Sequence, residues 1–243
     1  MKTLTFAGRN AKEILRDPIN LFFGLFFPIV LLLLLSAIGA NIPENFYEIQ
    51  DLAPGITVFG LSFMTLFSAT LVSKDRESAF LQRLYTTPLS ACDFIVGYML
   101  PLLTIALVQT VLCYLFSSLL GLSLGTTVII AVIGIIPMSI FNISLGLLCG
   151  SVLNSKQVGG ICGALLTNLS AWLSGVWFDL SLVGGAFEKI ADFLPFVHAV
   201  KAEIALLSGD YQSALPHLPV IFGYAMLTTV FAVILFLKQM KKQ

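Results

Sequence analysis

Two sets of residues in the sequence could carry chemistry: one matches the catalytic motif of a serine hydrolase, and the other is a pair of histidines that could bind a metal. Gly121-Leu122-Ser123-Leu124-Gly125 matches the G-x-S-x-G nucleophile elbow, and Asp179 and His198 follow in the order of a hydrolase triad. A nucleophile elbow needs a strand before the serine and a helix after it, whereas this motif joins two long apolar stretches. His198 and His217 do not have the spacing of an HExxH zinc site. We therefore expect neither catalytic residues nor metal ligands in this chain.

The motif for nucleotide hydrolysis is missing from the sequence. A phosphate-binding loop reads G-x-x-x-x-G-K-[ST], and the chain contains no Gly-Lys pair. The four cysteines form no CxxC pair, and three of them lie inside apolar stretches, where a free cysteine behaves as a small hydrophobe. Any ATP chemistry that serves this protein is therefore expected on another chain.

Charged residues are concentrated in short segments between long apolar ones. Hydrophobic residues make up 58% of the chain and charged residues 11%, with a mean hydropathy of +0.97, outside the range of soluble domains. Eleven of the 13 Lys and Arg residues lie within 2–16, 74–83, at 156 or within 238–242. By the positive-inside rule these four segments face the cytoplasm. A formal net charge of zero leaves no broad basic surface, so nucleic acid is not an expected partner.

The apolar stretches have the length of membrane helices. A bilayer core takes about 20 residues of helix, and continuous runs such as Ile29–Leu35 lack the alternation of a barrel strand. The predicted fold is an all-α integral membrane protein with one domain and both termini in the cytoplasm. Its six transmembrane helices are expected at residues 19–40, 54–73, 94–120, 126–153, 157–175 and 218–237.

The segment 176–216 is expected outside the cytoplasm without crossing the membrane. Asp179, Glu188, Lys189 and Asp192 argue against a seventh span, because each charge costs about 2.5–3.5 kcal/mol at the centre of a membrane helix. We expect short re-entrant helices here, broken near Gly184-Gly185 and near Pro195.

The N-terminal segment, residues 1–18, has the pattern of an amphipathic helix at the membrane interface. At helical spacing one stripe is apolar and the opposite side is charged, and Pro18 ends the segment. It either anchors the chain in the bilayer or also contacts a cytosolic partner. The apolar stripe consists of Leu4, Ala7, Ala11, Ile14 and Leu15.

The cytoplasmic loop 74–93 is longer than a plain connection requires. It predicts a short helix that Pro88 ends, with an apolar face formed by Phe80, Leu81, Leu84 and Tyr85. A partner with an apolar groove could hold these side chains; the alternative is a helix that rests on lipid headgroups.

The same loop resembles a known family of membrane proteins. It contains Asp75-Arg76-Glu77, then Leu81-Gln82-Arg83-Leu84, then Thr87-Pro88-Leu89, and is similar to the permeases of type-two ABC exporters. It departs from the family at Ala79-Phe80, where a Gly-Thr step is usual. Segments 173–178 and 194–199 resemble the outer segment between spans five and six of these permeases.

The resemblance implies a half-transporter in the cytoplasmic membrane of a bacterium, exporting drugs or other amphiphiles. A second permease chain, identical or different, would complete the pathway, and two copies of a separate ATPase would bind ATP and magnesium. An ATPase-independent channel or membrane assembly factor is the alternative. The residues expected to couple the permease to the ATPase are Arg76, Glu77, Phe80, Leu81, Arg83, Leu84 and Tyr85.

The pathway and its outer gate are assigned by position. We find no charged residue deep in a predicted span, so the polar residues expected inside the membrane are neutral; each candidate could equally serve in packing or face lipid. Two glycine patterns, 146–150 and 159–163, predict close packing of spans four and five, or a dimer seam. The candidate lining is Phe63, Met64, Phe67, Asn142, Asn168 and Trp172, and the candidate gate is Trp177, Phe178, Pro195 and Phe196.

Overall fold

The structure, a computed structural model, describes residues 2–41, 48–78, 80, 83 and 90–240. Within these ranges it is helical and has no strand. Helix α1 (Lys2–Leu15) is followed by a long helix built from α2 (Pro18–Leu21), the π-helical turn η1 (Phe22–Phe26) and α3 (Phe27–Gly39). Asp17 begins this long helix, because its Oδ1 accepts a hydrogen bond from the Asn20 backbone N–H at 3.2 Å and Pro18 follows at the first helical position.

Five helices of the described chain come next. They are α4 (Ile49–Gly60) and α5 (Ser62–Glu77), separated only at Leu61, then α7 (Ala91–Leu119), then α8 (Thr126–Gly134) and α9 (Ile136–Val152). Helix α7 begins with a capping box in which Ser90 and Asp93 bond reciprocally to each other's backbone N–H groups.

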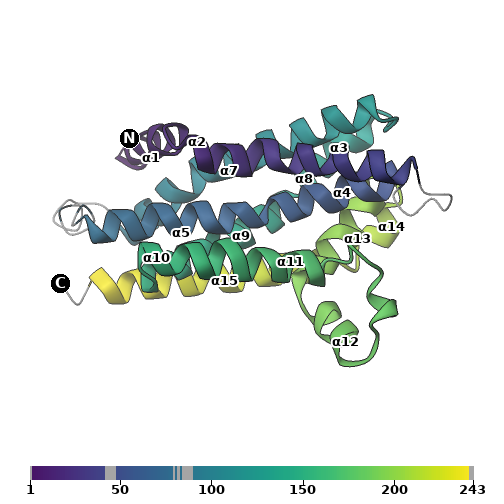
Figure 1. The fold of residues 1–243 in the computed structure, drawn as a ribbon. Helices are drawn as coiled ribbons and strands as arrows, with labels where there is room; N and C mark the ends of the chain where they lie inside the picture. Colours follow the sequence, from purple (N-terminus) through teal and green to yellow (C-terminus); the bar gives the residue numbers. More distant parts are fainter. Residues whose placement is uncertain (1, 42–47, 79, 81–82, 84–89, 241–243) are drawn as a thin grey trace.

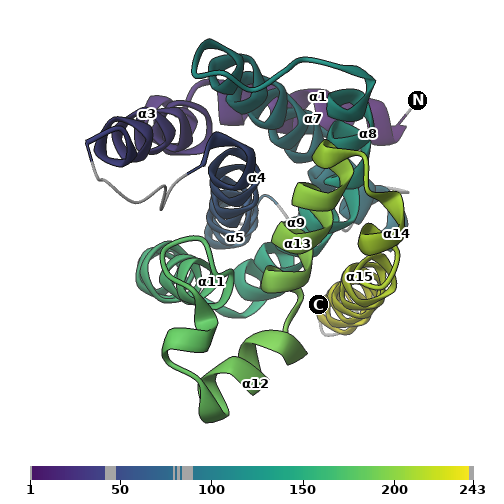
Figure 2. The ribbon, with the colours of Figure 1, turned by 90° about the vertical axis from the view of Figure 1, so that its right-hand side faces the viewer.

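A π-helical segment and several short helices complete the chain. Helices α10 (Ser155–Val158), η2 (Gly159–Leu166) and α11 (Thr167–Leu173) run on as one helix. The short helices η3 (Leu180–Leu182), α12 (Gly185–Phe193), α13 (Pro195–Ser208) and α14 (Tyr211–Ala214) precede the last long helix, α15 (Leu218–Met240). Seen end-on, α12 projects from the bundle and α13 lies across it (Figure 2).

Five helices of the described chain are long and apolar enough to cross a membrane: Pro18–Gly39, Ile49–Glu77, Cys92–Leu119, Thr126–Val152 and Tyr211–Lys238. The fifth span predicted from the sequence, 157–175, is helical from Ser155 to Leu173 but is not one of these five. The observed helix includes Lys156, Gln157 and Asn168, which lower its apolar character. The chain is thus an all-α membrane protein, and a count of six spans stays a prediction.

The second predicted span, 54–73, differs most from the observed helix. The helix begins at Ile49 and continues to Glu77, with Pro54 inside α4. Proline is tolerated within membrane helices when the surrounding structure satisfies the freed backbone groups. At the other end, Lys74 to Glu77 belong to the last turn of α5 rather than to a loop. Of the short helix predicted to end at Pro88, only Phe80 and Arg83 are among the described residues.

Glycine packing joins α9 to α5, and this corrects the prediction for the glycine patterns. A Cβ atom on Gly146 would overlap Ser68 Oγ and the Thr65 carbonyl oxygen, and one on Gly150 would lie 2.5 Å from the Ala69 carbonyl oxygen. Both glycines therefore face span two and not span five. A Cβ atom on Gly159 or Gly160 would meet no described atom within 4 Å, so neither glycine forms a seam within the described chain.

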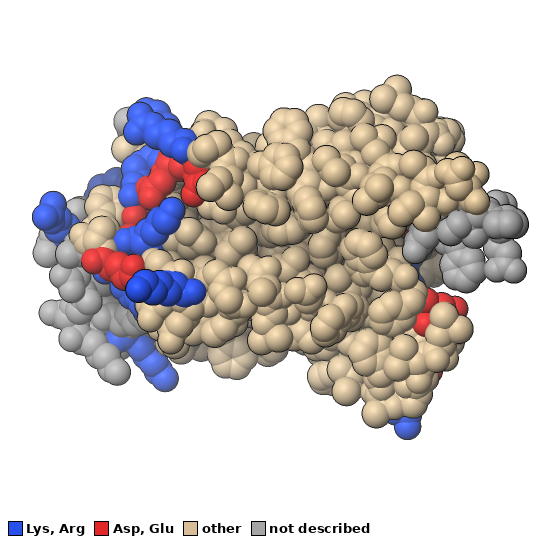
Figure 3. Space-filling model, in the orientation of Figure 1, with Lys and Arg blue, Asp and Glu red and all other residues tan. Residues whose placement is uncertain are grey.

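The two ends of the molecule differ in charge. Both termini lie at the same end (Figure 1), and nearly all visible Lys and Arg side chains gather there (Figure 3). We call it the cation-rich end. The opposite end carries α12, α13 and α14 and shows a small group of carboxylates beside α12 (Figure 3).

Candidate functional site

Helix α1 packs against α7 at the cation-rich end, and its buried face shares only Ala7 and Ile14 with the predicted apolar stripe. Its buried residues are Phe6, Ala7, Asn10 and Ile14, while Leu4 and Leu15 are 67% and 65% exposed. The Phe6 ring meets Tyr98 edge-on with centroids 5.0 Å apart. Gly97 permits this approach, because a Cβ there would overlap the Phe6 ring. The predicted stripe thus faces outward in part, and Phe6 with Asn10 forms the protein contact.

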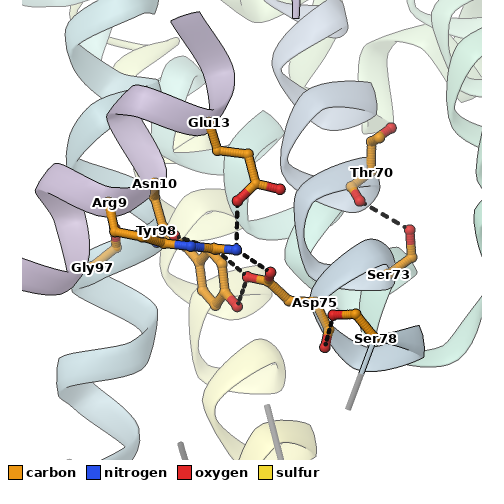
Figure 4. Close-up of polar contacts among 9 residues, drawn as sticks. All are labelled: Arg9, Asn10, Glu13, Thr70, Ser73, Asp75, Ser78, Gly97 and Tyr98. Atoms are coloured by element: carbon orange, nitrogen blue, oxygen red, sulfur yellow. Dashed lines mark hydrogen bonds and ion pairs between the residues drawn. The ribbon is translucent and has the colours of Figure 1, made fainter. Parts of the chain in front are cut away.

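Asp75, at the end of α5, is the centre of a polar cluster that joins three helices (Figure 4). Arg9 of α1 donates from Nη1 and Nη2 to Oδ2 and Oδ1 of Asp75, both at 2.7 Å. Tyr98 of α7 donates its hydroxyl to Oδ2 at 2.7 Å. Asp75 is 1% exposed. A buried carboxylate needs paired charge and hydrogen bonds, and this two-bond fork with a phenol supplies them.

Arg9 also contacts two residues of its own helix and Phe80, which lies in the cytoplasmic loop after α5. Its Nη2 lies 2.5 Å from Glu13 Oε2, and its Nη1 donates to Asn10 Oδ1 at 2.9 Å. Asn10 in turn donates to the Gly97 carbonyl at 3.0 Å. The Arg9 guanidinium lies 4.2 Å from the centroid of the Phe80 ring, a cation–π contact. Phe80, predicted as an anchor for the ATPase, is thus half-buried against α1.

Arg76 and Glu77 hold the turn between α9 and α10. Arg76 donates from Nη1 to the Ser151 carbonyl and from Nη2 to the Leu153 carbonyl at 2.5 Å. Glu77 accepts from the Ser155 backbone N–H at 2.8 Å and from its hydroxyl at 2.7 Å. The cation therefore lies at the C-terminus of one helix and the anion at the N-terminus of the next, as the helix dipoles favour.

The three consecutive charges of Asp75-Arg76-Glu77 thus contact different parts of the protein. Asp75 binds α1 and α7, while Arg76 and Glu77 bind the α9–α10 turn. We call these residues and their partners Arg9, Tyr98 and Ser155 the charged junction. From the sequence, Arg76 and Glu77 were expected to orient a docked ATPase. In the structure, each of them instead binds a partner within the same chain. Arg83 is exposed, and Leu81, Leu84 and Tyr85 lie outside the described residues.

The candidate pathway residues do not lie together. Phe63, Met64 and Phe67 are at most 6% exposed, inside the core of the protomer. Asn142 is also buried, donating to the Met138 carbonyl at 3.0 Å and accepting from Thr65 Oγ1 at 3.1 Å. The last two residues lie on another surface: Asn168 is exposed, and Trp172 is 51% exposed. The four buried residues could line a pathway only if the helices around them separated. A lining role stays a prediction for all six residues.

The candidate gate residues all lie near α12 and α13 but in separate contacts. Trp177 meets Phe59 of α4 edge-on at 5.8 Å between centroids, and Phe178 lies 6.2 Å from Phe187 of α12. Pro195 begins α13 after the extended Leu194. Phe196 is buried against Phe141 of α9 at 5.8 Å. The predicted breaks near Gly184-Gly185 and Pro195 coincide with the ends of α12, and the gating role stays a prediction.

Glu203 is a buried acid that sequence reasoning missed. It lies in the segment 176–216 that was expected outside the cytoplasm, but it is 1% exposed on α13 and accepts a 2.5 Å hydrogen bond from Tyr114 of α7. Burial raises the pKa of the Glu203 carboxyl from 4.5 to about 8. The signal in the sequence was a single acid in the otherwise apolar run Ala202 to Leu207.

Fold and comparison define the class. The chain is a multi-pass helical membrane protein with a charged junction at one end, and the family model described as ABC-2 type transporter matches residues 1–207. The chain belongs to this family and is a transmembrane permease of an ABC-2 transporter, a transport subunit that works in a membrane with an ABC ATPase. No curated protein matches the sequence.

Proposed function

We propose that the chain is the permease subunit of an ATP-driven exporter of amphiphilic molecules in the cytoplasmic membrane of a bacterium. Two permease chains form the pathway, and two copies of a separate ATPase bind ATP and magnesium. The cation-rich end faces the cytosol, in agreement with the positive-inside rule. The ATPase binds the loop that follows α5, through Phe80, Leu81, Leu84 and Tyr85, with Arg83 at the rim of the contact.

The observation that supports this proposal is the charged junction. The loop follows directly on residues whose side chains bind α1, α7 and the α9–α10 turn. A displacement of the loop by the ATPase therefore acts on several helices at once. Since buried ion pairs and packed helices resist gradual deformation, such a displacement shifts them together. In this scheme Arg76 and Glu77 transmit the motion, and the apolar loop residues bind the partner.

The proposal is tested by separating capture of the ATPase from coupling. The chain is co-expressed with a candidate ABC ATPase from the same genome, and co-purification and substrate-stimulated ATP hydrolysis in vesicles are measured. Leu84→Ala and Tyr85→Ala should each weaken capture roughly thirtyfold, the effect of losing about 2 kcal/mol from a buried anchor. Arg76→Ala should retain the ATPase while reducing the stimulated hydrolysis.

Leu119→Ala is the matched control, because it truncates a 78% exposed leucine at the end of α7 far from the loop. It should leave both measurements unchanged. If the wild-type chain captures no ATPase, or if the two loop variants capture and transport normally, the chain acts instead as an ATPase-independent channel or assembly factor.

A further inference from the structure

A cavity of about 460 Å³ opens at the end opposite the termini. Four separate segments surround it: the beginning of α4, the chain from Ser174 to Ser181, α12, and one face of α13. In Figure 3 a small group of carboxylates is visible at this end, beside the lobe that contains α12. Its volume lies in the range of small-molecule binding sites, about 300–1,000 Å³. We call it the outer pocket.

The outer pocket has an excess of negative charge. Among the described residues that line it are the acids Asp51, Asp179, Glu188 and Asp192 and a single cation, Lys201. The Lys201 ammonium lies 3.6 Å from Asp192 Oδ1, so one carboxylate already balances it. Asp179 accepts a hydrogen bond from the Ser181 backbone N–H at 2.9 Å, and this bond lowers the pKa of Asp179. The pocket therefore has negative charge in excess of its own cation.

Two of these carboxylates have no partner in the described parts of the chain. Asp51 lies in the first turn of α4 and Glu188 in the first turn of α12, and neither side chain makes an ion pair or hydrogen bond there. They come from helices far apart in the sequence and line the same cavity. Their charges are thus available to a ligand.

The pocket also has an aromatic wall. Trp177 and Phe178 line it, and the edge-on contact with Phe59 supports the indole. The Trp177 Nε1 atom is buried and finds no acceptor among the described residues. Aromatic faces attract organic cations, so this wall suits a ligand with a positively charged head.

A bare metal ion fits the outer pocket less well than an organic cation. A divalent ion such as Ca²⁺ needs six to eight oxygens at about 2.3–2.6 Å, and no group of three or more potential ligand residues converges in this way within the described chain. We propose that the outer pocket binds an organic cation, with its charge near Asp51 and Glu188 and its apolar body against Trp177 and Phe178. The site is complete in one chain and needs no ATPase.

The test uses Trp177 as its own reporter. The chain contains two tryptophans, so Trp172→Phe leaves the indole of the pocket as the single one. Benzyltrimethylammonium is titrated into this purified variant in detergent, with neopentylbenzene as its uncharged counterpart of the same shape. The cation should change the Trp177 emission with saturation, and added salt should weaken the binding. Neopentylbenzene should bind more weakly.

Variants that remove single carboxylates test whether the organic cation binds in the outer pocket. Asp51→Asn and Glu188→Gln should each weaken binding of benzyltrimethylammonium roughly two- to fivefold, as expected for solvent-accessible ion pairs. Glu48→Gln is the matched control, because it removes an exposed carboxylate just before α4 that does not line the pocket. Thermal unfolding verifies that each variant is folded.

Four results would overturn the proposal. These are a lack of saturation, equal binding of neopentylbenzene, a loss in Glu48→Gln as large as in Glu188→Gln, or complete displacement of the organic cation by equimolar Ca²⁺. The last result would identify a metal site instead.

Discussion

Asp75 illustrates at the scale of one residue how a charge is kept inside this protein. Its carboxylate is withdrawn from water at the end of a membrane helix, and both of its partners come from other helices. Removing one partner from a buried ion pair costs more than the pair contributes, because the remaining charge stays buried. The stability of the cation-rich end should therefore depend on each bond in the charged junction.

Tyr98→Phe should reveal this dependence, since it deletes only the hydroxyl that donates to Asp75. A hydrogen bond to a charged group contributes about 2 kcal/mol, which corresponds to a fall in Tm of roughly 4–8 °C for a chain of this size. Tyr224→Phe is the control, because its hydroxyl donates to the neutral Phe193 carbonyl at 2.8 Å near the surface. Equal shifts in the two variants, measured by thermal unfolding in detergent, would contradict the account of Asp75.

Glu203 leads to a prediction about pH. Its carboxyl has a higher pKa in the folded chain, about 8, than the ordinary 4.5, so the unfolded chain releases this proton first as pH rises. The contribution of Glu203 to stability is therefore fully present below pH 4.5 and is lost progressively up to about pH 8. Glu203→Gln keeps an acceptor for Tyr114 and removes the titration.

The measurement for Glu203 is Tm against pH in detergent. Wild type should lose more stability than Glu203→Gln between pH 5 and 9, by at least about 5 °C in Tm. Glu48→Gln, which removes an exposed carboxylate, should follow the wild-type curve. Parallel curves for wild type and Glu203→Gln would show that the buried carboxyl does not control stability.

At the scale of elements, the contact between α5 and α9 organises the membrane domain. Two small side chains of α5 bond to the backbone of α9: Thr65 Oγ1 donates to the Asn142 carbonyl at 2.9 Å, and Ser68 Oγ donates to the Ile143 carbonyl at 3.0 Å. Such bonds require the helix axes to approach closely, and Gly146 and Gly150 provide the space.

Gly146→Ala should separate these two helices. The added methyl group overlaps backbone as well as the Ser68 hydroxyl, and overpacking of this kind costs about 1–3 kcal/mol. Gly159→Ala adds the same methyl group to a helix at a position with no described neighbour within 4 Å, so it should be neutral. The readout is Tm and the yield of monodisperse protein. A neutral Gly146→Ala would mean that the α5–α9 contact tolerates expansion.

At the scale of the whole molecule, the two ends carry different chemistry. The cation-rich end holds the termini and the charged junction, and the opposite end holds the outer pocket with its carboxylates (Figures 1 and 3). This asymmetry follows the distribution of Lys and Arg along the sequence, and it supports the proposed orientation in the membrane.

The orientation can be measured with single cysteines in a background without the four native ones. In intact cells Ser78→Cys, at the end of α5, should be protected from an impermeant thiol reagent, whereas Ala186→Cys, exposed on α12, should be labelled. Ala186 is preferred to Gly185, whose φ of +62° disfavours a side chain. Permeabilised cells provide the control, in which both positions should react. Labelling of Ser78→Cys in intact cells would reverse the proposed topology.

The class of this protein could be predicted from hydropathy and charge alone. Apolar runs of membrane length have few stable solutions, because a backbone in lipid must satisfy its own hydrogen bonds. Lys and Arg, which carry a large cost inside the bilayer, then mark the ends of the helices. The helix breaks at Gly184-Gly185 and Pro195 were also predictable, because the backbone conformations of glycine and proline are local properties. The motif Asp75-Arg76-Glu77 indicated a functional segment, but the sequence did not show which residues these three side chains bind.

The contacts between distant side chains could not be predicted in this way, because they depend on how the helices pack. Hydropathy placed Asp75 and Glu203 among solvated charges, yet both are buried, because Arg9, Tyr98 and Tyr114 approach them from helices distant in the sequence. The glycines of α9 were expected to face span five or a second chain, but in the structure they pack against α5, which belongs to the second span. The outer pocket likewise joins α4 to α12, more than a hundred residues later. Pairing between distant helices depends on shape and on the cost of leaving a charge unpaired, and neither is encoded in local sequence spacing.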